Sequence, residues 1–275
     1  MDRVHDLAAD RLAELRNADG GFGMRAGQPS EPEPTALAAL ALDDGGARGW
    51  LEAAQRVDGS FGLDVGPYAN DAATGLAALA LSAGAARERA LDHVERTRAA
   101  RVETSPVNPI DPDAIGWPWA TGTASWTEPT ARALLALRIV RPASPAIDDA
   151  IAMLRDRETV GGGWNYGNKT VLGEDLAPFV QTTAFALVAL RGVDPELEGR
   201  GLRVLRRRWS AEAAGGLSVA TTVAAFRVHG DERAAGEASA VLGRLVKETA
   251  LLGDGVALAW SVLATGSGLA GLEVR

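Results

Sequence analysis

Two kinds of helix-forming segment alternate along this chain. In the first kind, apolar residues recur at helical spacing among charged ones, as in residues 6–16, where Leu7, Leu12 and Leu15 stand between acidic and basic side chains. Further segments of this kind are residues 48–56, 86–98, 145–157, 196–208 and 231–247. The pattern is typical of amphipathic helices that expose one polar face.

The second kind of segment is apolar on nearly every side. It is rich in alanine and leucine, and the clearest copies are residues 36–42, 76–81, 131–137 and 184–190. A helix without a polar face is buried on most sides. Six amphipathic outer helices, each preceding an apolar inner one, predict an all-α fold: an (α/α)6 toroid in a single domain over residues 1–275. An open α-solenoid has the same alternation. A closed ring is favoured because the last unit shows no polar capping face.

A glycine-aromatic turn precedes the inner segments, and a threonine begins most of them. The turns are residues 19–23, 58–62, 116–119, 161–164 and 215–217, with a weaker copy at 253–264. The interval between threonines is 39 residues from Thr35 to Thr74 and again from Thr183 to Thr222. The two longer intervals between them predict loop insertions near residues 101–126 and 158–181, which in repeat proteins often form the binding face.

Charge and composition limit the classes of binding partner and the cellular locations that fit this chain. The net charge is −8, which argues against a nucleic-acid partner. The basic run at residues 200–208 is interpreted as the solvated face of an outer helix; the alternative is peripheral contact with an anionic membrane surface or a partner protein. No apolar run is long enough to span a bilayer, and the first residues lack the apolar core of a signal peptide. A cytoplasmic location is therefore predicted.

The chain contains no cysteine. Disulfides, thiolate zinc sites and cysteine nucleophiles are therefore excluded. The three histidines, His5, His93 and His229, are far apart in the sequence. We interpret each as structural or exposed and predict no metal site from them.

The turns and inner helices carry a family resemblance. The Asp-Gly-Gly-Phe-Gly turn at 19–23 and the Gln-Arg-Val-Asp-Gly-Ser-Phe-Gly stretch at 55–62 resemble the glutamine-aromatic repeats of squalene-hopene and other triterpene cyclases. The Thr-Ala-Leu-Ala-Ala-Leu helix at 35–40 also resembles the β-subunits of protein prenyltransferases. The resemblance covers residues 6–265. It implies a terpenoid cyclase or prenyltransferase toroid whose central apolar cavity holds an isoprenoid, with Mg²⁺ as cofactor for a diphosphate substrate.

Polar residues stand just before the threonines of four inner helices. Helix N-termini favour carboxylates and anions. In the resembled families, this stretch carries either the proton-donating aspartate of the cyclases or the zinc-binding cysteine of the prenyltransferases. The resemblance thus implies catalytic roles for Glu33, Glu128 and Asp71 and substrate-binding roles for Asn70 and Gln181. The acid motif is incomplete here, since Pro34 replaces its third carboxylate. Helix capping and first-turn charge are the alternative roles of the two glutamates.

The predicted insertions supply the other candidate residues. Aromatic faces stabilise cations and pack on isoprenoid chains, which marks Trp117, Trp119, Trp126, Trp164 and Tyr166 as substrate-binding candidates; the alternative is that they plug the ring. The Asp-x-Asp pair of Asp111 and Asp113 is a candidate for binding a metal-diphosphate.

Three hypotheses follow. The first is an isoprenoid transferase or simple cyclase, with an open cavity and carboxylates at its mouth. The second is a non-catalytic toroid that binds a lipid or a partner protein, with a filled or carboxylate-free cavity and an exposed apolar patch. The third is a carbohydrate-active (α/α)6 enzyme, which needs two carboxylates about 5–10 Å apart; Glu33 with Glu128 or Asp71 would supply them.

Overall fold

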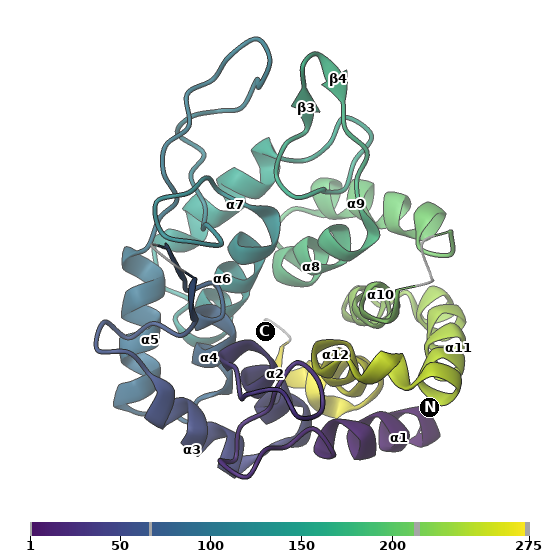
Figure 1. The fold of residues 1–275 in the computed structure, drawn as a ribbon. Coiled ribbons are helices and arrows are strands. Elements are labelled where there is room, and N and C mark those ends of the chain that lie inside the picture. The colour runs from purple at the N-terminus through teal and green to yellow at the C-terminus, as the bar shows by residue number, and fades with distance from the viewer. Residues whose placement is uncertain (1, 66–67, 212–214, 273–275) are drawn as a thin grey trace.

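The computed structural model describes residues 2–65, 68–211 and 215–272 (Figure 1). Its helices form two concentric rings. The inner ring consists of α2 (Pro32–Leu42), α4 (Thr74–Ala80), α6 (Thr127–Val140), α8 (Val180–Leu190), α10 (Gly216–Val228) and α12 (Gly255–Thr265). Each inner helix packs against the next, and α12 packs against α2, which closes the ring. The predicted all-α (α/α)6 toroid is confirmed, and the open solenoid is wrong.

The outer ring surrounds the inner one. It consists of α1 (Asp2–Ala13), α3 (Gly45–Ala54), α5 (Ala85–Arg96), α7 (Ala146–Asp156), α9 (Pro195–Arg208) and α11 (Glu232–Thr249). In space, each outer helix from α3 to α11 packs on the inner helix that it follows in the chain. Helix α1 packs on α12, so the N-terminal helix contacts the last inner helix of the ring.

Short elements complete the described chain. Two-residue and three-residue strands form two antiparallel hairpins: β1 (Leu63–Val65) with β2 (Tyr68–Asn70), and β3 (Thr170–Val171) with β4 (Glu174–Asp175). Two 3₁₀ helices, η1 (Ala250–Gly253) and η2 (Ser267–Gly271), flank α12. The long connections 97–126 and 157–179 lie beside each other at one edge of the ring (Figure 1), where the Leu172 N–H donates to the Val107 carbonyl at 2.9 Å.

The threonines of the repeat hold the glycine-aromatic turns on the inner helices. The Thr35 hydroxyl accepts a hydrogen bond from the Phe22 N–H at 2.9 Å and donates to the Phe22 carbonyl at 3.2 Å. The same pair of bonds joins Thr74 to Phe61 and Thr183 to Trp164. Because the backbone N–H and carbonyl of the aromatic residue both hydrogen-bond to this hydroxyl, its ring can enter the core without burying an unpaired N–H.

The centre of the ring is filled by side chains. Leu76, Leu135, Phe185 and Trp260 line a cavity of only about 10 Å³ next to Arg132, which is about the space of one water molecule. The Phe185 and Trp260 rings meet edge to face, with centroids 5.2 Å apart. The inner helices therefore surround a packed core. Among residues 2–65, 68–211 and 215–272, no helix combines the length and apolar composition needed to cross a membrane.

Candidate functional site

The predicted polar site residues gather at one end of the ring. Because each outer helix returns the chain in the opposite direction, the N-termini of the inner helices all lie at the same end, which we call the mouth. The β-bridge between Asn70 and Ala120 joins the loops that precede α4 and α6 there. The candidates at the N-termini of α2, α4, α6 and α8 are Glu33, Asp71, Glu128 and Gln181.

A buried arginine joins two of these carboxylates. Nη2 of Arg132, in the second turn of α6, lies 2.5 Å from Oε1 of Glu33 and 2.6 Å from Oε1 of Glu128. Glu33 belongs to α2, which is separated from α6 by α4 in the ring. Gly75 lets α4 pack closely on α6, since a Cβ at this position would lie 3.0 Å from the Arg132 carbonyl oxygen. The ion pairs therefore tie together helices that are not neighbours.

The two carboxylates are close to each other. Both oxygens contact the same nitrogen, so Glu33 Oε1 and Glu128 Oε1 lie at most about 5 Å apart. This limit is close to the spacing of about 5–5.5 Å between the two carboxyl groups of retaining glycosidases. Their surroundings differ. The Glu128 side chain is 9% exposed and the Glu33 side chain 27% exposed. A substrate at the mouth would therefore meet Glu33 first.

The charges of this cluster favour one proton on Glu128. Burial raises the pKa of Glu128 above its ordinary value; Arg132 opposes the rise, Glu33 adds to it, and burial with Glu33 outweighs the arginine. Burial lowers the pKa of Arg132, but the two carboxylates outweigh burial and hold that pKa above its ordinary value. The buried Glu128 carboxyl therefore holds its proton more tightly than an ordinary glutamate does.

Two further side chains complete what we call the Arg132 cluster, formed by Glu33, Glu128, Arg132, Trp119 and Gln181. Gln181 on α8 hydrogen-bonds to Glu128. The guanidinium carbon of Arg132 lies 5.1 Å from the Trp119 ring centroid, an arrangement in which the ring face attracts the cation. Nη1 of Arg132 has no hydrogen-bond partner among the described residues. The cluster therefore links α2, α6, α8 and the loop before α6.

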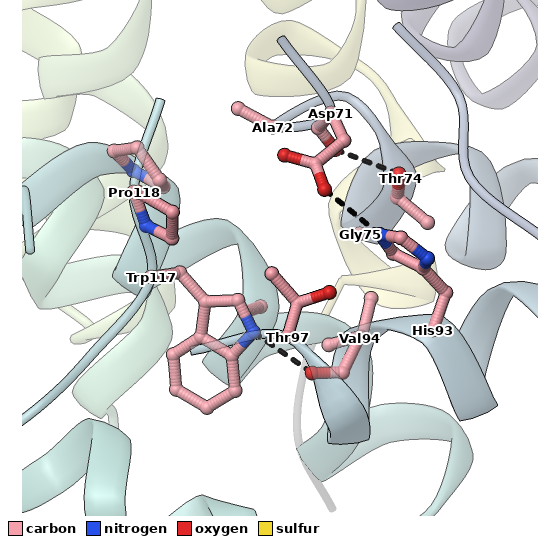
Figure 2. Close-up of a pocket in the computed structure, with 11 residues that line it drawn as sticks. Asp71, Ala72, Thr74, Gly75, His93, Val94, Thr97, Trp117 and Pro118 are labelled. Atoms are coloured by element: carbon pink, nitrogen blue, oxygen red, sulfur yellow. Dashed lines mark hydrogen bonds and ion pairs between the residues drawn. The ribbon is translucent and has the colours of Figure 1, made fainter. Parts of the chain in front are cut away.

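The third predicted carboxylate forms a separate pair with a histidine. Asp71 Oδ2 lies 2.8 Å from Nε2 of His93, which belongs to the last turn of α5 (Figure 2). Both side chains line a cavity of about 20 Å³, enough for one water molecule. The other nitrogen of the imidazole, His93 Nδ1, lies 3.7 Å from Oδ2 of the exposed Asp58. The Asp71–His93 pair therefore joins the loop before α4 to the last turn of α5.

One short segment covers both groups. In residues 117–121, Trp119 faces Arg132, Ala120 bridges to Asn70, and the Thr121 hydroxyl donates to Asp71 Oδ2 at 3.4 Å. Trp117 is buried below, and its indole N–H donates to the Val94 carbonyl at 2.9 Å (Figure 2). Trp119 is thus the tryptophan of this segment that contacts Arg132, whereas Trp117 packs against α5.

An open groove runs beside the mouth. Trp126, Tyr166, Leu176 and Phe179 line it, and we call it the aromatic groove. Its volume is about 350 Å³. The Tyr166 ring centroid lies 4.9 Å from that of Phe179 and 6.3 Å from that of Trp126. Trp126 and Phe179 are the N-caps of α6 and α8, so Glu128 and Gln181 follow the groove by two residues each.

The remaining predicted residues lie outside both groups. Trp164 is fully buried, and its indole N–H donates to the Leu154 carbonyl at 2.7 Å. Asp111 and Asp113 are exposed, and Asp113 forms an ion pair with Arg101 at 3.2 Å. No group of three histidine, aspartate or glutamate side chains suited to a metal ion occurs in the described part of the chain.

Comparisons with known proteins show similarity in the fold. No protein-family model matches the chain, and no curated protein matches its sequence. Among solved structures, the chain is similar to an inactive double aspartate-to-alanine variant of the α-1,6-mannanase GH76A of Salegentibacter sp. HEL1_6 in complex with α-1,6-mannotetrose. That match has 12% identity and a TM-score of 0.57, and it covers 95% of this chain and 98% of the mannanase. A protein from Actinoplanes matches at 14% identity and a TM-score of 0.52, over 94% and 79% of the two chains.

The expected terpenoid cyclase or prenyltransferase relationship is therefore wrong, and so are the isoprenoid functions drawn from it. The similar mannanase is an (α/α)6 glycoside hydrolase. Between Leu76, Phe185 and Trp260 of the inner helices, the structure leaves only about 10 Å³ where an isoprenoid cavity was expected. The turns and threonine helices that carried the resemblance have a structural cause. Thr35 and Thr74 hold the turns on the inner helices. The small alanine side chains let neighbouring inner helices pack closely. A ring of this architecture needs both features, whatever ligand it binds.

Two site residues were missed. Arg132 is an isolated charge in an apolar inner helix, four residues after Glu128, and the i,i+4 spacing of opposite charges was the available signal. His93 was interpreted as structural or exposed, because its partner Asp71 lies 22 residues earlier, in the loop before α4. Only the packing of α5 against α4 brings them together.

Proposed function

We propose that this protein is a glycoside hydrolase that cleaves a saccharide at the mouth of the ring by a retaining mechanism. The observation that carries the proposal is the pair Glu33 and Glu128, which come from two inner helices and lie within about 5 Å of each other. Retaining glycosidases need one carboxylate as nucleophile and one carboxylic acid as proton donor at this spacing. The proposal replaces the isoprenoid hypothesis with the third hypothesis from the sequence.

The environments assign the two roles. Glu128 is buried and its pKa is raised, so it keeps a proton at a pH where an ordinary glutamate has lost it. Glu33 is the more exposed of the two side chains, and its Oε1 lies 2.5 Å from Nη2 of Arg132. Glu128 is therefore the general acid and Glu33 the nucleophile.

The reaction balances with these two groups and water. A Glu33 oxygen attacks the anomeric carbon, the glycosidic carbon–oxygen bond breaks, and the Glu128 proton moves to the leaving oxygen. Water then attacks the glycosyl ester, Glu128 takes up the water proton, and the Glu33 carboxylate leaves. Solvent at the mouth, to which the Glu33 side chain is 27% exposed, supplies the water.

The structural relatives support the class of substrate only by analogy. The similar mannanase was solved with α-1,6-mannotetrose, which makes α-1,6-linked mannose oligomers the first probe for this chain. Gluco-, galacto- and xylo-oligosaccharides belong in the same panel. A cytoplasmic location stays a prediction from the sequence.

The test is hydrolysis of this panel by the wild-type protein and by Glu33→Gln and Glu128→Gln, with products separated by chromatography. The proposal expects cleavage of at least one probe and a loss of at least about 100-fold in kcat for each variant. Glu158→Gln is the matched control, because Glu158 also pairs with an arginine, Arg200, but does not belong to the Arg132 cluster. No cleavage of any probe by the wild-type protein, or equal losses in all three variants, would contradict the proposal.

A further inference from the structure

We propose that the aromatic groove is a binding subsite for an uncharged sugar ring of the substrate. The choice of a saccharide rests on the proposed function. The groove itself is an independent observation, since none of its lining residues belongs to the Arg132 cluster or the Asp71–His93 pair.

The groove has the size and lining of a small-ligand site. Its volume of about 350 Å³ falls in the range of about 300–1,000 Å³ that is usual for such sites, which are typically lined by aromatic residues with a few polar groups. Trp126, Tyr166 and Phe179 are 36%, 57% and 40% exposed. Their rings contact one another in a row, so they present a continuous aromatic wall to solvent.

The backbone around these rings is fixed while the rings stay open to solvent. The Tyr166 carbonyl accepts a hydrogen bond from the Thr127 N–H at 3.0 Å, and the Phe179 N–H donates to the Trp164 carbonyl at 2.9 Å. The buried Asn165 accepts from the Gly167 N–H at 3.0 Å and donates to the Asn168 carbonyl at 2.7 Å. Exposed aromatic rings on a fixed backbone lose little conformational entropy when a ligand binds.

The charges around the groove favour a neutral ligand. No charged side chain lines it among the described residues. The exposed acidic residues Glu174 and Asp175 directly precede Leu176 of the groove lining, and the whole chain carries a net charge of −8. A uronic or sulfated sugar would therefore meet nearby acidic side chains and no cation in the groove lining. A neutral sugar ring meets no such penalty.

Polar groups in the wall match the hydroxyl edge of a sugar. The Ser125 hydroxyl accepts from the Gly116 N–H at 2.9 Å and keeps its own proton for a ligand. The exposed Asn168 side chain makes no hydrogen bond within the described residues and offers both a donor and an acceptor. A pyranose ring has an apolar C–H face for the aromatic wall and hydroxyl groups for these two side chains.

The test measures binding by calorimetry and by saturation-transfer NMR, with Glu128→Gln as the protein so that probes are not consumed. The probes are neutral manno-, gluco-, galacto- and xylo-tetrasaccharides and, as the acidic class, oligogalacturonides. The variant Tyr166→Ala removes the most exposed ring. Val160→Ala is the control, because Val160 is 72% exposed in the same connection but does not line the groove.

We expect at least one neutral probe to bind, with affinity reduced at least tenfold by Tyr166→Ala and unchanged by Val160→Ala, and no binding of the acidic probes. Binding of acidic probes as tight as neutral ones, or neutral binding that survives Tyr166→Ala, would overturn the inference. Cleavage by the wild-type protein together with binding that does not depend on Tyr166 would overturn only the proposed sugar subsite in the groove. Tyr166-dependent binding without cleavage would overturn the proposed hydrolysis alone.

Discussion

The hydroxyl of Thr35 both accepts from the N–H of Phe22 and donates to the carbonyl of Phe22, at 2.9 and 3.2 Å. Thirteen residues separate the two, and the same separation joins Thr74 to Phe61 and Thr130 to Trp117. One hydroxyl thus satisfies the backbone of a turn whose aromatic ring is buried. This relationship explains why threonine, glycine and an aromatic residue recur together along the chain.

We expect Thr35→Val to lower the free energy of unfolding by about 1–3 kcal/mol, because it leaves the buried Phe22 N–H unpaired. The matched control is Thr222→Val. Thr222 is buried at the corresponding position of a later repeat, but its hydroxyl oxygen has no hydrogen-bond partner in the described structure. Its replacement should be neutral or stabilising. Urea unfolding of both variants measures the difference, and equal losses would show that the bonds to Phe22 are not the reason for the threonine.

Arg132→Met should destabilise the fold by about 3–5 kcal/mol, because it removes the buried cation that both the half-buried Glu33 and the buried Glu128 contact. Arg141→Met is the control. Arg141 also contacts three acidic side chains, Glu88, Asp92 and Glu95, but these pairs are partly exposed on the outer ring. Its loss should be no more than about 1 kcal/mol. A similar loss for both arginines in thermal or urea unfolding would mean that the Arg132 cluster is not buried as the structure has it.

The raised pKa of Glu128 predicts a specific pH dependence of stability. The folded protein binds the Glu128 proton more tightly than the unfolded chain does, so this contribution is fully present below the ordinary glutamate pKa of 4.5 and is lost as pH rises through the raised value. The stability of the wild-type protein relative to Glu128→Gln should therefore fall over that window and then level off. A relative gain in stability with rising pH would indicate that Arg132 lowers the pKa instead.

Gly62→Ala should lower the unfolding free energy by more than about 2 kcal/mol and disturb the Asp71–His93 pair. A Cβ at Gly62 would lie 1.5 Å from the Asn70 carbonyl oxygen, so the segment that carries Asp71 would have to move. Gly49→Ala in α3 is the control, since its Cβ would meet no atom within 4 Å and alanine favours a helix. Melting temperatures and the NMR signal of the His93 ring measure both effects. An unchanged His93 signal in a folded Gly62→Ala variant would contradict this coupling.

The sequence predicts the ring well because the ring depends on local patterns. The alternation of amphipathic and apolar helices, and the spacing from Thr35 to Thr74, follow from packing rules that act within each repeat. The position of Glu33 and Glu128 at helix N-termini follows in the same way. What they contact does not, because the bond from Arg132 to Glu33 joins residues 99 positions apart and exists only when the ring is closed.

The family assignment failed for a related reason. The turn at 19–23 resembles a motif of isoprenoid enzymes, but its contacts with Thr35 serve the ring and not a ligand. His93 and Arg132 gave no motif, because the partner of His93 lies 22 residues away in a loop, and Arg132 is an isolated charge in an apolar segment. The aromatic groove was partly predicted, through Trp126 and Tyr166, whereas Phe179 joins it only in space.

The most direct measurement is covalent trapping of the glycosyl–enzyme intermediate. The protein is incubated with 2-deoxy-2-fluoroglycosyl fluorides of manno, gluco and galacto configuration, digested with trypsin and analysed by mass spectrometry. The account predicts one fluoroglycosyl group on Glu33, in the peptide of residues 26–48, and none in Glu33→Gln. An adduct on another residue, or no adduct with any of the three reagents, would contradict it.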